Sequence, residues 1–247
     1  MPISPNQGST GGGTTVTITG TNLAGATAVH FGTKLGTITA NTPTSVTVIS
    51  PSGTGTVNVT VTTPGGTSNP LPFFYVGAPF KSSLSPVTGP TAGGDTVTIT
   101  GTGLSTATSV AFGAASAAPT VVNDSQLTVT VPPGAAAGSV GVSVTTAGGT
   151  NNGLSYTYVD APTVISLTPT AGPTSGGTGV TITGTQLTTT QSVSFGGAPA
   201  PFDVINDTTI SAVTPPGPAG AVDVTVVTTG GAATAAGAFT YTAGPGI

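Results

Sequence analysis

The sequence predicts an all-β protein made of three tandem copies of one small β-sandwich domain. Three observations lead to this prediction: the sequence repeats itself along its whole length, apolar and polar residues alternate along short β-branched runs, and Gly or Pro interrupts these runs at regular intervals. No stretch carries a helical apolar stripe of adequate length. The 39 Gly and 22 Pro among 247 residues recur at fixed places, as expected of a folded repeat protein.

The clearest repeat is a block that starts at Gly12, Gly93 and Gly176, at offsets of 81 and 83 residues. It reads GGTTVTITGTNLAGATAVHFG, GGDTVTITGTGLSTATSVAFG and GGTGVTITGTQLTTTQSVSFG. In each copy it is followed by a Val-x-Val-x-Val strand, a Gly-Gly turn and an aromatic closing strand (Phe73-x-Tyr75, Tyr156-x-Tyr158 and Phe239-x-Tyr241). These matches predict three domains, covering residues 1–77, 78–160 and 161–247.

Within each copy the apolar residues recur with a period of two. Val16 and Ile18 share one face of a strand, opposite Thr15, Thr17 and Thr19. About seven such strands in about 80 residues, each with one apolar face, require two packed antiparallel sheets. We therefore expect a sandwich whose core or core edge also takes the tyrosines, Tyr75, Tyr156, Tyr158 and Tyr241.

The recurrent glycines and Asn-Asp pairs mark the turns of this sandwich. Gly20, Gly101 and Gly184 close the second strand, and Gly32, Gly113 and Gly196 follow a core Phe. At both sets we expect a positive φ, which a residue without Cβ adopts at little cost. Asn123-Asp124-Ser125 and Asn206-Asp207-Thr208 are predicted to be Asx turns, because one carboxylate each is too few for a calcium site.

A longer pattern runs through every copy: Pro-x-x-Gly-(Pro)-x-x-Gly-Gly-x-x-Val-Thr-Ile-Thr-Gly-Thr-x-Leu, followed by Val-x-Phe-Gly. The second copy carries it at Pro86, Gly89, Pro90, Gly93, Gly94, Val97, Ile99, Gly101, Leu104, Val110, Phe112 and Gly113. The third carries it at Pro169, Gly172, Pro173, Gly176, Gly177, Val180, Ile182, Gly184, Leu187, Val193, Phe195 and Gly196. The first copy has Ser9 where the others have Pro, but keeps Pro5, Gly8, Gly12 and Gly13.

This pattern resembles the IPT/TIG domain, and the resemblance covers essentially the entire chain. It implies an immunoglobulin-like fold in three tandem copies, of the kind found in bacterial surface and secreted proteins. Similar domains also occur in animal receptors, in some transcription factors and beside starch-acting enzymes. The resemblance therefore implies a fold and says little about function.

Composition excludes several classes of partner. The formal net charge is −4, and Lys34 and Lys81 are the two basic side chains apart from one histidine. Two lysines cannot neutralise a run of phosphates, so we expect no nucleic-acid partner. No apolar run approaches the roughly 20 residues that a bilayer span needs, so we expect no membrane insertion.

The inventory of reactive side chains argues against an enzyme. The sequence has one His, His30, and contains no Cys, Glu, Arg or Trp. His30 stands between Val29 and Phe31, so its side chain is predicted to point outward. Asp203 and Asp207 are the one close pair of carboxylates, and a turn explains them. We therefore expect no catalytic residue, no cofactor and no metal site.

Positions at which one copy departs from the others are the best candidates for an interface. Phe74 replaces Thr157 and Thr240, on the face opposite Phe73 and Tyr75. Phe80, beside Lys81, replaces Thr163. With His30, these residues predict a specialised contact surface in or near the first copy. The two phenylalanines either seal the first domain against the second or dock a neighbouring molecule.

The leading hypothesis is a non-enzymatic structural or interaction protein, extracellular or at the cell surface. Short linkers at Val76–Pro79 and Val159–Pro162 predict an extended rod. Its nearly uncharged sides favour association with copies of itself into a larger assembly or filament. One alternative is an adhesin-like module for a glycan or a host protein, and another is a phage virion decoration or tail appendage. Met1–Pro5 leads into the repeat without a signal peptide, so a cytoplasmic or virion location stays open.

Overall fold

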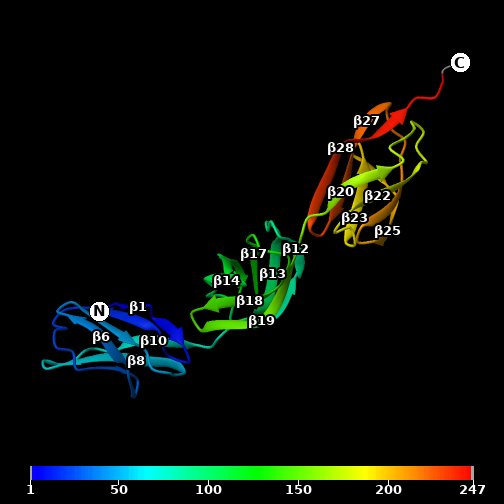
Figure 1. The fold of residues 1–247 in the computed structure, drawn as a ribbon. Coiled ribbons are helices and arrows are strands. Elements are labelled where there is room, and N and C mark those ends of the chain that lie inside the picture. The colour runs from blue at the N-terminus through cyan, green and yellow to red at the C-terminus, as the bar shows by residue number, and fades with distance from the viewer. Residues whose placement is uncertain (1, 246–247) are drawn as a thin grey trace. The chain divides into compact units, whose positions relative to one another are not determined.

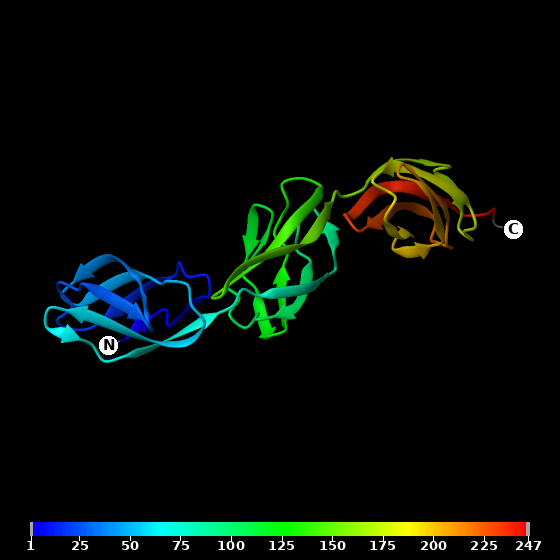
Figure 2. The ribbon, with the colours of Figure 1, turned by 90° about the horizontal axis from the view of Figure 1, so that it is seen from below.

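A computed structural model describes residues 2–245, and that part of the chain consists of strands and loops without a helix. Its strands form six sheets, two for each copy of the repeat. We call the copies domain 1 (β1–β10), domain 2 (β11–β19) and domain 3 (β20–β28). Figures 1 and 2 show each domain as its own layered set of strands. The prediction of tandem all-β sandwiches is confirmed.

Domain 1 packs a four-stranded sheet against a six-stranded one. The first sheet has the order β1 (Ile3–Ser4), β3 (Thr15–Thr19), β7 (Ser45–Ile49), β6 (Thr37–Thr42). The second has the order β2 (Gln7–Ser9), β10 (Leu71–Val76), β8 (Gly55–Thr63), β4 (Ala28–Phe31), β5 (Lys34–Leu35), with β9 (Gly66–Thr67) paired to β8.

Domains 2 and 3 repeat this topology with sheets of four and five strands. Domain 2 has the orders β11 (Phe80–Ser85), β13 (Thr96–Thr102), β17 (Gln126–Thr130), β16 (Thr120–Asn123) and β12 (Thr88–Pro90), β19 (Gly149–Val159), β18 (Gly138–Thr146), β14 (Ser109–Phe112), β15 (Ala115–Ala117). Domain 3 has the orders β20 (Thr163–Thr168), β22 (Gly179–Thr185), β26 (Thr209–Val213), β25 (Phe202–Asn206) and β21 (Ala171–Pro173), β28 (Gly231–Thr242), β27 (Gly220–Thr228), β23 (Thr190–Phe195), β24 (Ala198–Ala200).

In each domain the lead-in strand divides between the two sheets. Its first part pairs antiparallel with the next long strand, as β1 does with β3. Its second part pairs parallel with the closing strand: β2 with β10, β12 with β19, and β21 with β28. The beginning and end of every domain are thereby hydrogen-bonded neighbours.

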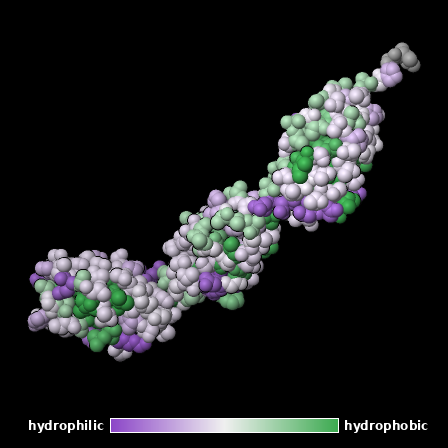
Figure 3. Space-filling view, viewed as in Figure 1, coloured by the Kyte–Doolittle hydropathy of each residue, from purple (hydrophilic) through white to green (hydrophobic). Residues whose placement is uncertain are grey.

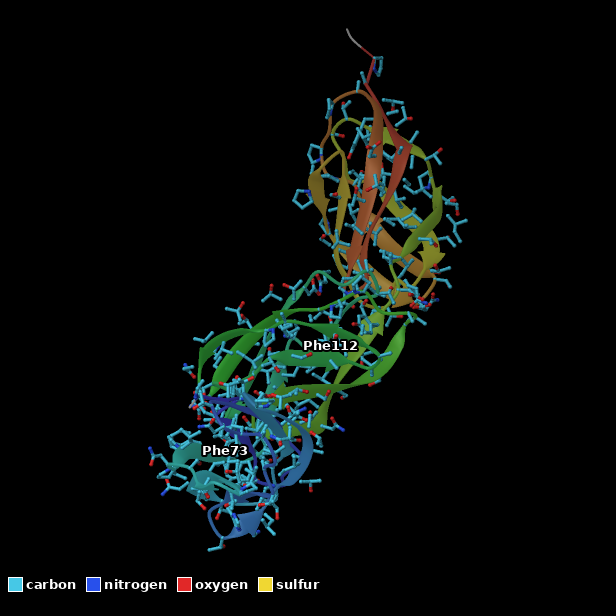
Figure 4. The ribbon with its side chains drawn as sticks, turned by 90° about the vertical axis from the view of Figure 1, so that its left-hand side faces the viewer. Phe73 and Phe112 are labelled. Atoms are coloured by element: carbon cyan, nitrogen blue, oxygen red, sulfur yellow. The ribbon has the colours of Figure 1, made fainter. Side chains whose placement is uncertain are left out.

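The core of each domain lies between its two sheets. The predicted alternation holds, because Val16 and Ile18 are fully buried while Thr15 and Thr19 are exposed. Aromatic rings fill the centre: Phe73 meets Phe31 and Tyr75 edge to face, with ring centroids 5.1 and 5.2 Å apart. Such aromatic pairs contribute about 0.5–1.5 kcal/mol each beyond the burial of their area. Figure 4 shows Phe73 and Phe112 among the strands of domains 1 and 2.

One tyrosine of each closing strand ties that strand to a loop of the opposite sheet. The hydroxyl groups donate to proline carbonyls: Tyr75 to Pro51 at 2.8 Å, Tyr158 to Pro132 at 2.7 Å and Tyr241 to Pro215 at 2.6 Å. The loop backbone lies directly against the tyrosine ring at Gly53, Gly134 or Gly217, where a Cβ would overlap the ring. All four tyrosines are buried, which confirms their expected place in the core.

The glycine predictions are half correct. Gly32, Gly113 and Gly196 have φ values of 62°, 61° and 57°, as expected after the core Phe. The prediction of a positive φ at Gly20, Gly101 and Gly184 is wrong. At Gly101 and Gly184 the strand continues, and each is glycine for another reason. A Cβ there would overlap the carbonyl oxygen of Phe80 or Thr163 on the neighbouring strand, where the pairing shifts by one residue.

Domain 2 differs from the other two at one buried tyrosine. Tyr156 takes the place of Phe73 and Phe239, and Asp95 takes the place of Thr14 and Thr178. A Cβ at Gly89 would overlap both the Tyr156 hydroxyl and a carboxylate oxygen of Asp95, so the two groups meet at this glycine. Burial, and then the negative charge of Asp95, raise the pKa of Tyr156 to about 12.

The tyrosine–proline hydrogen bond leads to a first prediction. Replacing Tyr241→Phe is expected to lower the unfolding free energy of domain 3 by about 1 kcal/mol, because the Pro215 carbonyl loses its donor. Hydrogen exchange of domain 3 amides across a denaturant series measures this change. Thr240→Ser, on the exposed side of the same strand, is the control, and an equal loss there would contradict the assignment.

A second prediction concerns alkaline stability. The pKa of Tyr156 in the folded state lies above the unfolded value of 10.0. Its contribution to the unfolding free energy of domain 2 is therefore complete below pH 10 and is lost as the pH rises towards about 12. Tyr156→Phe, which restores the residue found in domains 1 and 3, should flatten this fall and remove a phenolate absorbance step near pH 12. If the unfolding free energy of wild type and variant fell in parallel as the pH rises, the prediction would be refuted. Thr157→Ser serves as the control.

Candidate interaction surface

Several polar side chains among residues 2–245 support turns. Among residues 2–245 no three or more His, Cys, Asp or Glu side chains come close enough to hold a metal. Asp124 accepts hydrogen bonds from the Ser105 hydroxyl at 2.7 Å, the Gly103 N–H at 3.1 Å and the Ser105 N–H at 3.3 Å. These bonds, the Ser105 hydroxyl first, lower the pKa of the Asp124 carboxyl. The carboxylate therefore braces a loop.

The two predicted Asx turns are confirmed. Asn123 Oδ1 accepts the Ser125 N–H at 2.8 Å, and Asn206 Oδ1 accepts the Thr208 N–H at 2.8 Å. Asp207, in the second turn, accepts the Thr188 hydroxyl at 2.8 Å. Turn structure thus accounts for these Asn and Asp side chains.

The side of β2–β10–β8–β4–β5 that faces away from the core carries the residues that distinguish domain 1. Phe74 lies opposite Gln7 and Thr56, and His30 lies between Thr60 and Leu35 in the register of the sheet. We call Phe74, Thr56, Thr60, His30 and Leu35 the outer face. Phe74 is 41% exposed and Leu35 is 61% exposed, while the core residues Phe73 and Phe31 lie on the opposite side.

The same positions in the other two domains carry smaller or more polar residues. In the order Phe74, Thr56, Thr60, His30, Leu35, the counterparts are Thr157, Ser139, Ser143, Ala111 and Ser116 in domain 2, and Thr240, Ala221, Thr225, Ser194 and Pro199 in domain 3. The outward orientation expected for Phe74 and His30 agrees with the structure. Leu35 was missed by the sequence prediction, although the contrast with Ser116 and Pro199 marks it in the same way.

Phe80 and Lys81 lie apart from this face, on β11 of domain 2. Phe80 is 64% exposed and lies opposite Thr102. Lys81, expected in the interface, is instead buried at 8% exposure, and its ammonium group donates to the Val142 carbonyl at 2.6 Å. It occupies the position that Val164 has in domain 3, and this burial takes Lys81 off the surface. Whether Phe74 and Phe80 seal two domains stays a prediction.

The surface offers little else that is chemically distinctive. On the face that Figure 3 shows, weakly polar residues predominate and a few hydrophobic groups lie among them, as expected for a chain with 3% charged residues. Because the tyrosine rings are buried, they are not available to stack on a sugar ring. The exposed phenylalanines Phe74 and Phe80 are thus the aromatic groups through which the described residues can make an external contact.

Three two-sheet units, each with Pro, Gly and Tyr at corresponding positions, define a tandem array of immunoglobulin-like domains. The IPT/TIG domain model matches residues 1–75, 79–158 and 162–241. The chain belongs to this family, and the resemblance inferred from the sequence pattern is confirmed. A search of curated proteins finds no match.

Several solved structures match this chain. The plexin A4 extracellular region matches at 22% identity and a TM-score of 0.51, over 93% of this chain and 22% of that one. SGBP-B of the Bacteroides ovatus mixed-linkage glucan utilization locus, in complex with a heptasaccharide, matches at 17% identity and a TM-score of 0.31, over 96% and 65%. The Escherichia coli adhesin FdeC matches at 14% identity and a TM-score of 0.35, over 95% of both chains.

The similarity to plexin A4, at 22% identity, concerns the fold alone. The chain spans about a fifth of the plexin A4 region, 22% of its length. Across residues 2–245 there is no helix with the length and apolar character of a membrane span.

Buried Lys81 leads to a third prediction. Burial lowers the pKa of Lys81 below its ordinary 10.5, so the unfolded chain holds the proton more tightly than the folded one. The unfolding free energy of domain 2 should therefore rise with pH through the window that ends near 10.5. Lys81→Met should remove this rise, as measured by hydrogen exchange at a series of pH values. Phe80→Thr, at the adjacent residue, is the control, and an unchanged slope in Lys81→Met would overturn the account.

Proposed function

We propose that this chain is a non-enzymatic structural and interaction protein, extracellular or at the cell surface, that associates with copies of itself into a larger assembly. The observation that carries the proposal is the outer face of domain 1. There Phe74 and Leu35 are exposed at positions where the same sheet of domains 2 and 3 has Thr, Ser or Pro.

Burying these two side chains against a partner removes apolar surface from water, and each Å² so buried contributes about 25 cal/mol. Thr56, Thr60 and His30 lie on the same face and supply hydroxyl and imidazole groups for a polar border. A second copy suits this face because the net charge of −4 is carried by few side chains and opposes close approach only weakly.

A second candidate function is that of an adhesin-like module for a glycan or a host protein. Its support is the position of Phe74 between Gln7 and Thr56, because an exposed ring with polar neighbours is a common platform for a sugar. The buried tyrosines and the absence of Trp leave few other rings for such a site, so self-association is the better supported function.

Within this proposal the domains keep the boundaries 1–77, 78–160 and 161–247. Their arrangement as an extended rod stays a prediction, as does the hypothesis of a virion decoration or tail appendage. The proposed partner is protein, with no role for nucleic acid.

The fourth prediction tests the outer face. The double variant Phe74→Ser/Leu35→Ser is expected to weaken self-association about tenfold or more, because it gives domain 1 the polar character of the other copies. Sedimentation velocity over a concentration series measures the dissociation constant. Val122→Ser, at a position in domain 2 that is 56% exposed, is the matched control.

Equal dissociation constants for the double variant and wild type would exclude the outer face as a contact. Binding of a glycan by the wild-type chain on an array, lost in the double variant, would favour the second candidate function instead.

A further inference from the structure

The charged side chains are distributed unevenly among the three domains. Residues 1–77 contain Lys34 and no Asp or Glu, so the formal side-chain charge of domain 1 is +1. Residues 78–160 contain one Lys and three Asp, and residues 161–247 contain three Asp and no Lys or Arg, which gives −2 and −3. The net charge of −4 therefore combines one positive domain with two acidic ones.

The positive charge of domain 1 lies at the edge of the outer face. Lys34 is exposed on β5, the edge strand of this sheet, next to Leu35. Its ammonium group donates to the carbonyl oxygen and the hydroxyl of Ser52 at 2.8 and 3.3 Å, which leaves one of its three N–H groups for an external acceptor. Because Lys81 is buried, Lys34 is the exposed ammonium side chain among the described residues.

Most of the carboxylates interact within their own domain. Those that accept a hydrogen bond there are Asp124, Asp160, Asp207 and Asp223. Asp95 lies beside the buried Tyr156 hydroxyl. Asp203 is exposed, and its carboxylate has no hydrogen-bond or ion-pair partner among residues 2–245. Asp203 is thus the carboxylate most available to a cation outside its domain.

Asp203 lies on a face of domain 3 that also carries exposed apolar side chains. On the outward side of β25 and β26, Asp203 is opposite Ser211. Ile205, two residues along β25, is 61% exposed, and Val213, two residues along β26 from Ser211, is 43% exposed. We call Asp203, Ile205, Ser211 and Val213 the Asp203 face. In the register of domain 2 their counterparts, in the same order, are Thr120, Val122, Thr128 and Thr130.

We propose that the outer face of domain 1 binds the Asp203 face of domain 3 in a second copy, with Lys34 donating to the Asp203 carboxylate. This inference rests on the proposed self-association and names the surface that the outer face meets. Each of the two surfaces combines one charged group with exposed apolar side chains, and the two charges are of opposite sign. Pairing domain 1 with domain 1 would instead bring two Lys34 ammonium groups to one contact.

The proposed contact is heterologous, because two different surfaces meet. A copy that is bound through its outer face still presents its Asp203 face, and the reverse holds for its partner. Further copies therefore add in sequence and form an open filament or a closed ring. A symmetric contact between two outer faces would end at a dimer.

The fifth prediction uses charge reversal on the two faces. Lys34→Asp alone opposes two carboxylates at the contact, and Asp203→Lys alone opposes two ammonium groups, so each variant should raise the dissociation constant about tenfold. An equimolar mixture of the two variants offers only opposite charges when the copies alternate, and it should associate about as tightly as wild type. Sedimentation velocity of the full chain, up to about 1 mM, compares wild type, the two variants and the mixture.

Asp223→Lys is the matched control, because it makes the same charge change at an exposed residue on the other sheet of domain 3. Wild-type association in Asp203→Lys, an equal loss in Asp223→Lys, or a mixture no tighter than its components would overturn the pairing. Recovery in the mixture supports it and also shows that both variants fold.

The same measurements separate this pairing from the proposed function. A wild-type chain that stays monomeric at the highest concentration refutes self-association itself. A loss in Phe74→Ser/Leu35→Ser without any loss in the two charge variants keeps the outer face as a contact and refutes only its pairing with the Asp203 face.

Discussion

The hydrogen bond from a closing-strand tyrosine to a proline carbonyl connects the two sheets of each domain. The ring of Tyr75, Tyr158 or Tyr241 fills the end of the core, and its hydroxyl fixes the loop that follows the opposite sheet. That loop in turn positions the lead-in strand, because Gly53, Gly134 and Gly217 donate to the carbonyls of Thr10, Thr91 and Thr174. In each domain the Thr-x-Gly-Gly segment of the repeat, which begins at Thr10, Thr91 or Thr174, is thus hydrogen-bonded to the loop that covers the tyrosine.

Most of the fold follows from the sequence. The alternation of apolar and polar residues and the recurrence of the same block in three copies both point to the same strands. Prediction failed where two segments distant in the sequence touch. Gly101 and Gly184 are glycines because a neighbouring carbonyl lies against them, and no local pattern reveals that contact. Lys81 was expected in the interface as the neighbour of Phe80. Comparison with Val164 in the third copy marks the position as apolar, and the long side chain reaches the Val142 carbonyl from there.

The candidate surfaces were partly accessible to the same comparison between copies. Phe74 and His30 depart from their counterparts and do face outward, and Leu35 departs in the same way.

The parallel pairing between the second part of the lead-in strand and the closing strand has a mechanical consequence. In domain 1, β2 lies beside β10, from which the chain leaves, and the two run in the same direction. A pull applied to the two ends of the domain therefore acts along the strands in opposite senses. It loads the interstrand hydrogen bonds together in shear, and they resist as a group instead of opening one after another. The same parallel pairing in β12–β19 and β21–β28 gives domains 2 and 3 the same shear geometry.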